Sequence, residues 1–89
     1  MNRKDIIAEL VRGELIGSRV SVVGTPLRGK ILDETKTRFV LLTEDNKRKI
    51  IVKAQNAFEF EFKGEKIIIK GSLLAVKPEE RIRLKIKWQ

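Results

Sequence analysis

Short apolar segments alternate with polar turns along most of the chain. They predict strands over residues 18–23, 28–34, 38–43, 47–52, 58–62, 66–70 and 81–88. Residues 58–62 alternate strictly, so we expect three phenylalanines inward and two glutamates outward. This spacing indicates a small antiparallel barrel or sandwich, and a barrel is favoured because closure removes exposed strand edges. We therefore expect a mainly β fold, a small antiparallel barrel of six or seven strands.

Residues 29–43 predict the central strand, turn and strand of this fold. Ile31 and Leu32 precede a polar turn, and residues 39–42 form an apolar run after it. A strand with one wet face would alternate, so both faces of these strands should be covered. One face belongs to the core, and the other is covered by another part of the chain or by a partner.

A short amphipathic helix is predicted within residues 1–13. Ile6, Ile7, Leu10 and Val11 form one apolar stripe at helical spacing, and Gly13 is a suitable helix end. A helix of this length is marginal alone in water, so it needs a surface to pack on. That surface is either its own barrel or a partner protein, and the sequence leaves both open.

Length and composition limit the classes of function. The chain has 89 residues, so we expect one domain over residues 1–89. It contains neither cysteine nor histidine. The missing residue types remove thiol nucleophiles, the usual general base and most zinc sites, which argues against an enzyme with catalytic residues of its own. No long apolar run or signal-peptide core is present, so we expect a cytoplasmic protein.

The charge pattern favours a polyanionic partner. The formal net charge is +8, which for a small domain most often indicates nucleic acid. Acidic pairs at 33–34 and 44–45 point to opposite faces of a strand, so we expect no metal site. If residues 81–88 form a strand, one outward row that can follow a phosphate backbone contains Arg81, Arg83, Lys85 and Lys87. The phenylalanine rings are expected inside and Trp88 is the one candidate for exposure, which favours structured RNA over stacked single strands.

Several short motifs, in order, resemble those of the archaeal ribonuclease P protein component 1 family. The matching segments are Glu14-Leu15-Ile16-Gly17, residues 29–35, Val52-Lys53-Ala54, Phe58-Glu59-Phe60, residues 71–74 and residues 77–81. Thr37 departs from the asparagine usual in the family, and a β-branched residue disfavours a left-handed turn. The resemblance implies an Sm-like or SH3-like barrel that serves as a non-catalytic subunit of an enzyme whose RNA cleaves the 5′ leader from precursor tRNA.

The resemblance also implies two partners. One is the RNase P RNA, with Mg²⁺ on the RNA and no cofactor on the protein, and precursor tRNA is met indirectly. The expected RNA-binding residues are Arg28, Lys30, Lys36, Arg38, Lys53, Arg81, Arg83 and Lys85. The other partner is a small zinc-ribbon subunit, and its expected contact residues are Ile6, Ile7, Leu10 and Leu15. The alternatives are an Sm-like RNA-binding protein that forms a homo-oligomeric ring and an SH3-like protein-interaction barrel.

Overall fold

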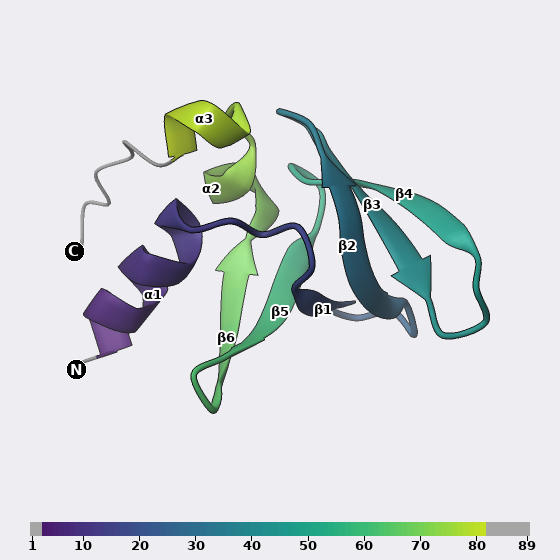
Figure 1. Ribbon diagram of the computed structural model, residues 1–89, viewed down its shortest axis with the longest axis horizontal. Helices are drawn as coiled ribbons and strands as arrows, with labels where there is room; N and C mark the ends of the chain where they lie inside the picture. The colour runs from purple at the N-terminus through teal and green to yellow at the C-terminus, as the bar shows by residue number, and fades with distance from the viewer. Residues whose placement is uncertain (1–2, 82–89) are drawn as a thin grey trace.

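The structure is a computed structural model that describes residues 3–81 (Figure 1). Its elements are α1 (Arg3–Arg12), β1 (Arg19–Val22), β2 (Arg28–Glu34), β3 (Arg38–Thr43), β4 (Arg48–Val52), β5 (Ala57–Phe62), β6 (Glu65–Lys70), α2 (Gly71–Leu74) and α3 (Pro78–Arg81). Six antiparallel strands and a short N-terminal helix confirm the predicted fold class.

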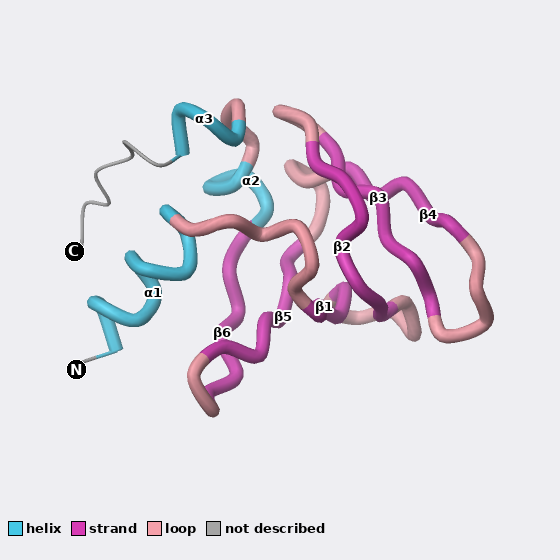
Figure 2. The backbone as a smooth tube through the Cα atoms, in the orientation of Figure 1, coloured by secondary structure: helices cyan, strands magenta, loops and turns pink. Residues whose placement is uncertain are grey.

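The six strands form one sheet in the order β4-β3-β2-β1-β5-β6. All neighbouring strands in this order are antiparallel, and a register shift between Ile31 and Asp33 bends β2 beside β3. The three helices gather at the β5–β6 end of the molecule, while β4 lies at the opposite end (Figures 1 and 2). No described helix is long and apolar enough to cross a membrane.

The core lies on the inner face of this sheet. Phe58 and Phe60 are buried there, as their alternation with Glu59 and Glu61 predicts. The rings of Phe39 and Phe58 meet edge to face, with centroids 5.1 Å apart and an interplanar angle of 85°. Phe39 comes from the central hairpin, so this contact joins the two halves of the sheet.

The N-terminal helix packs on its own domain. Ile6, Leu10 and Leu15 are buried in the core cluster, and Ile7 is only partly buried against it. A salt bridge between Lys63 Nζ and Glu9 Oε1, at 2.8 Å, also ties α1 to the β5–β6 turn. Three of the four residues expected to contact a protein partner are therefore not available on the surface of this structure.

The central turn closes without a left-handed residue. The Thr35 N–H donates to the Arg38 carbonyl at 2.9 Å, and the Arg38 N–H donates to Thr35 Oγ1 at 3.2 Å. Among the described non-glycine residues, only Asn46 and Lys63 have positive φ. Thr37 thus needs no left-handed geometry, which explains how the chain accommodates its departure from the family's usual asparagine.

The segment after β6 differs from its prediction. Residues 71–74, which lie after the predicted strand 66–70 and in no predicted element, form the helical turn α2. Its first residue packs so closely that a Cβ on Gly71 would lie 1.7 Å from the Lys53 carbonyl oxygen. Arg81, expected to begin a seventh strand with its side chain outward, instead ends α3 and is buried. Residues 82–88 of that predicted strand lie outside the described residues.

Candidate nucleic-acid interface

A row of cations crosses four strands on the outer face of the sheet. The register places Arg19 of β1 opposite Lys30 of β2, Lys30 opposite Leu42 of β3, and Leu42 opposite Arg48 of β4. Directly opposed residues share a face, and the three charged residues are exposed. Neighbouring strands are about 4.8 Å apart, so this cation row (Arg19, Lys30 and Arg48) spans roughly 14 Å.

Two members of the cation row oppose each other without a carboxylate between them. Arg19 and Lys30 are cross-strand partners, and no ion pair joins either side chain to another residue in the described part of the chain. Like charges directly opposite each other destabilise a sheet. Two neighbouring exposed cations concentrate positive charge, and such side chains are suited to contact phosphate oxygens.

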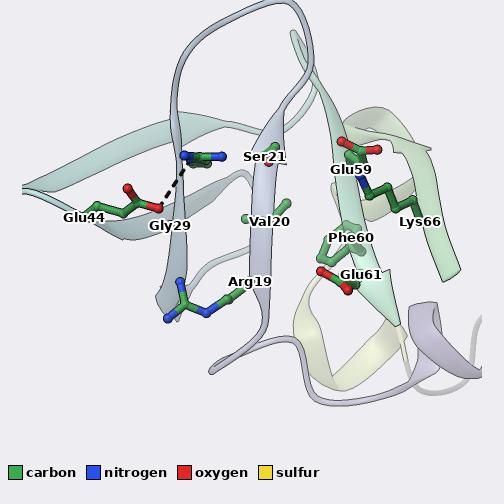
Figure 3. A pocket seen from close by; sticks show the side chains of 10 residues that line it. Arg19, Val20, Ser21, Gly29, Glu44, Glu59, Phe60, Glu61 and Lys66 are labelled. Carbon is green, nitrogen blue, oxygen red and sulfur yellow. Dashed lines mark ion pairs between the residues drawn. The ribbon is translucent and has the colours of Figure 1, made fainter. Parts of the chain in front are cut away.

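A shallow hollow of about 300 Å³ lies beside the row, over β1 and between β2 and β5 (Figure 3). Figure 3 shows Arg19 and Glu44 on one side and Glu59, Glu61 and Lys66 on the other, and Arg28 also lines the hollow. Arg28 Nε pairs with Glu44 Oε1 at 3.4 Å in an exposed ion pair, which stabilises the fold little and is easily exchanged for a phosphate. The side of the hollow toward β2 therefore carries Arg19 beside the Arg28–Glu44 ion pair, and the other side carries acidic and basic side chains together.

Two further cations of the predicted RNA-binding set lie at the β2–β3 turn. Lys36 and Arg38 are exposed in and after the β2–β3 turn, and Arg38 opposes Val52 on the outer face. The structure thus leaves Arg28, Lys30, Lys36 and Arg38 on the surface and brings Lys30 into the cation row. Arg83 and Lys85 lie outside the described residues.

Lys53 and Arg81, predicted as surface cations for RNA, do not lie on the surface, and this expected placement is corrected. Their side chains are buried around one carboxylate, that of Glu34, which is buried as well. Lys53 Nζ is 2.8 Å from Glu34 Oε2, and Arg81 Nη1 pairs with the same oxygen. Burial without a countercharge would be costly, so the carboxylate determines where these two cations reside.

The buried cluster (Glu34, Lys53 and Arg81) joins segments far apart in the sequence. Lys53 Nζ also donates to the Thr35 carbonyl at 2.6 Å and to the Leu74 carbonyl at 3.0 Å. Arg81 Nη2 donates to the Gly13 carbonyl at 3.2 Å. The cluster therefore holds α2, α3 and the end of α1 against the central hairpin.

Burial lowers the pKa of Lys53, because removing the ammonium group from water disfavours its charged form. The hydrogen bond and the charge of Glu34 oppose this shift, and the nearby Arg81 adds to it. Lys53 Nζ also lies 4.8 Å from the centroid of the Phe39 ring, a cation–π contact that compensates part of the lost hydration. All these contacts serve the fold.

An exposed apolar groove lies at the opposite end of the molecule from β4. Ile7 of α1, Ile68 of β6 and Leu73 of α2 line it, and Ile68 is 60% exposed. Of the predicted partner contacts, only Ile7 reaches this groove. The pattern of the helix alone does not predict that Ile68 and Leu73 lie beside Ile7.

The described residues contain no group of three or more acidic side chains that could hold a metal ion.

Arg19 was absent from the predicted RNA-binding set, although it is the residue that the register places against Lys30. The available signal was the alternation in 19–22, where Val20 and Val22 are inward and Arg19 must be outward. Which cation it opposes depends on strand pairing, which the pattern alone does not give.

The similarity of this chain to known proteins covers nearly its whole length. The family described as ribonuclease P/MRP, subunit p29, matches residues 8–84. The chain is 38% identical to ribonuclease P protein component 1 of Methanocaldococcus jannaschii, over 88% of both chains. It is 33% identical to the protein of the same name from Archaeoglobus fulgidus, over 84% of this chain and 78% of the relative.

Proposed function

Because the chain belongs to the ribonuclease P/MRP subunit p29 family, we propose that it is a non-catalytic RNase P subunit that binds the RNase P RNA through its cation row. Membership implies a role in tRNA processing and association with RNase P RNA and other subunits. In the proposed role the RNA, with its own Mg²⁺, removes the 5′ leader from precursor tRNA, and this chain supports the folded RNA. A cytoplasmic location is part of the same proposal.

The observation that supports RNA binding most directly is the opposition of Arg19 and Lys30 on an open sheet face. Within residues 3–81 the row has no aromatic ring for base stacking, since Phe39, Phe58 and Phe60 are buried in the core and Phe62 is partly buried against it. Arginine and lysine on a flat surface contact phosphate oxygens and fix the register of a duplex without reading its bases. The chemistry therefore fits a structured RNA recognised by its backbone and shape.

The proposed protein partner, a zinc-ribbon subunit of the same particle, fits the apolar groove of Ile7, Ile68 and Leu73. A large exposed isoleucine beside a helix is an apolar anchor of the kind that interfaces use. Ile68→Asp should weaken binding of that subunit by about tenfold or more. Ile50→Asp, a matched change of an isoleucine that is 64% exposed on β4, should leave this binding unchanged.

RNA binding is tested by titrating the RNase P RNA and an unrelated structured RNA of equal length across a salt series, with and without the zinc-ribbon subunit. We expect tighter binding to the RNase P RNA at moderate salt and a steep logarithmic salt dependence. Equal and weak binding of both RNAs in the presence of the partner would contradict the proposal.

A further inference from the structure

Strand β4 is an edge of the sheet, and its hydrogen-bonding pattern shows which of its backbone groups are open. The Thr43 N–H donates to the Lys47 carbonyl at 2.9 Å, and the Lys53 N–H donates to the Thr37 carbonyl at 2.8 Å. Paired residues alternate along an antiparallel ladder, so Lys49 and Ile51 bond to β3. The backbone groups of Arg48, Ile50 and Val52 must then face away from the sheet.

Part of this open edge is already occupied within the chain. The Val52 carbonyl accepts a hydrogen bond of 2.8 Å from Asn56 Nδ2. The remaining groups centre on Ile50, whose N–H and C=O both point outward. No described helix or strand lies beyond β4, because all three helices are at the other end of the molecule (Figure 1).

The side chains of the same residues make an apolar surface. Ile50 is 64% exposed and Val52 is 37% exposed, and both stand on the outer face. Val40 lies directly opposite Ile50 in β3, and it is partly buried. An open edge strand with exposed β-branched side chains is a template for another strand.

The charges around this edge select the class of occupant. Arg48 and Lys49 are exposed on β4, Arg38 stands opposite Val52, and β4 itself carries no carboxylate. The carboxylates around it are Asp33, across Val40, and Glu44 and Asp45, which line a hollow with Lys49. A second copy of this chain would bring the same cations against each other with no acid on β4. RNA offers neither a strand to pair with Ile50 nor apolar groups to cover it. An acidic strand with alternating apolar side chains can bond to the open backbone of Ile50, cover the apolar surface and supply carboxylates to the cations.

We propose that the β4 edge (Arg48–Val52) binds an acidic, extended segment of another protein, which adds a seventh strand to the sheet. The segment's backbone bonds to the open groups of Ile50, its apolar side chains cover Ile50 and Val52, and its carboxylates pair with Arg48 and Arg38. This surface is distinct from the groove of Ile7, Ile68 and Leu73, and binding at the edge does not depend on RNA binding.

The first experiment titrates the labelled protein with a capped heptapeptide of alternating glutamate and valine, followed by NMR and amide hydrogen exchange. We expect saturable binding, with shifts centred on β4 and added exchange protection of about tenfold or more at the Ile50 amide. Two control peptides carry the same residues with the valines in one block, or lysine in place of glutamate. Neither control should protect the Ile50 amide.

A proline substitution tests the backbone contact itself. Ile50→Pro removes only an N–H that faces outward, so the β3–β4 ladder should persist, and peptide affinity should fall by about tenfold, the value of one net hydrogen bond. If the proline variant fails to fold, Ile50→Lys serves as the second variant. It retains the backbone N–H and C=O and changes only an exposed side chain. Ile68→Lys is the control, and it should leave peptide affinity unchanged.

Four results would overturn the proposal. Equal binding of the lysine peptide would mean that carboxylates do not select the segment, and shifts centred on Arg19 and Lys30 would mean that charge alone attracts the acidic peptide. Concentration-dependent association in sedimentation that Ile50→Lys abolishes would assign the edge to a second copy. Protection of the Ile50 amide by the RNase P RNA, but not by the peptide, would assign the edge to the RNA.

Discussion

Two groups of cations lie in opposite environments in this molecule, one buried and one exposed. Lys53 and Arg81 are buried around the Glu34 carboxylate, whereas Arg19 and Lys30 oppose each other in the open without a carboxylate. In the buried cluster one carboxylate is shared by two cations, and both cations also donate to backbone carbonyls of distant segments. In the cation row the charges add, so positive potential is directed at the solvent. A lysine or arginine therefore serves binding only where its countercharge is left to a partner.

The two groups should respond to substitution in opposite ways, and the largest effect should come from removing the carboxylate. Glu34→Ala leaves two buried cations unpaired, so we expect the free energy of unfolding to fall by about 3–5 kcal/mol. Urea unfolding followed by circular dichroism measures this change. Glu61→Ala, a matched change of an exposed glutamate on β5, should shift stability by less than about 0.5 kcal/mol. Equal effects of the two changes would show that the cluster does not hold the fold.

The second effect is on RNA binding. Arg19→Ala with Lys30→Ala should weaken affinity for the RNase P RNA and flatten the logarithmic salt slope by about 0.7–0.9 for each phosphate that the protein no longer neutralises. Filter binding across a salt series measures the slope. Glu59→Ala, which lines the hollow on its other side, is the control and should not flatten it. A slope that persists in the double variant would place the RNA elsewhere.

The substitution that weakens RNA binding should also raise the stability of the fold by a small amount. Arg19→Ala relieves a directly opposed like-charge pair, so stability should rise by about 0.2–1 kcal/mol at low salt. The increase should shrink as salt screens the repulsion. Thermal unfolding at low and high ionic strength tests both statements, and a decrease in stability at low salt would show that Arg19 contributes to the fold.

The smallest expected effect is a change in the unfolding free energy with pH. The pKa of Lys53 is lowered in the folded protein from its ordinary value of 10.5, so the unfolded chain binds more protons between the two pKa values. The contribution of Lys53 to stability should therefore increase as pH rises through the folded pKa toward 10.5. The difference in unfolding free energy between the native chain and Lys53→Met, measured from pH 7 upward, isolates this group. A constant or falling difference would contradict the shift.

Much of the fold was predictable from the sequence, because strand alternation and turn residues act locally. The six strands begin and end within a residue or two of their predicted positions, and the inward phenylalanines are where alternation puts them. The helix was predicted, but whether its apolar stripe faced the barrel or a partner was a question of tertiary packing. The structure shows that the barrel itself buries Ile6 and Leu10.

The candidate site was less predictable, since it depends on which residues pair across strands. Lys53 follows a strand in a stretch rich in cations, and nothing local distinguishes it from Lys49, which is exposed. The hidden signal was Glu34, a carboxylate at an inward position beside the bulge of β2. A charged residue on the core side of a strand implies an opposite charge brought there from elsewhere in the chain.

The most direct test of this contrast is to measure the salt dependence of RNase P RNA binding for the Arg19→Ala, Lys30→Ala double variant beside Lys53→Met, both confirmed as folded. Each variant removes positive charge, but only the first removes it from the cation row. We predict a flatter salt slope for the double variant and the native slope for Lys53→Met, even though the latter is the less stable protein. A flattened slope for Lys53→Met with a native slope for the double variant would contradict the assignment of the two groups.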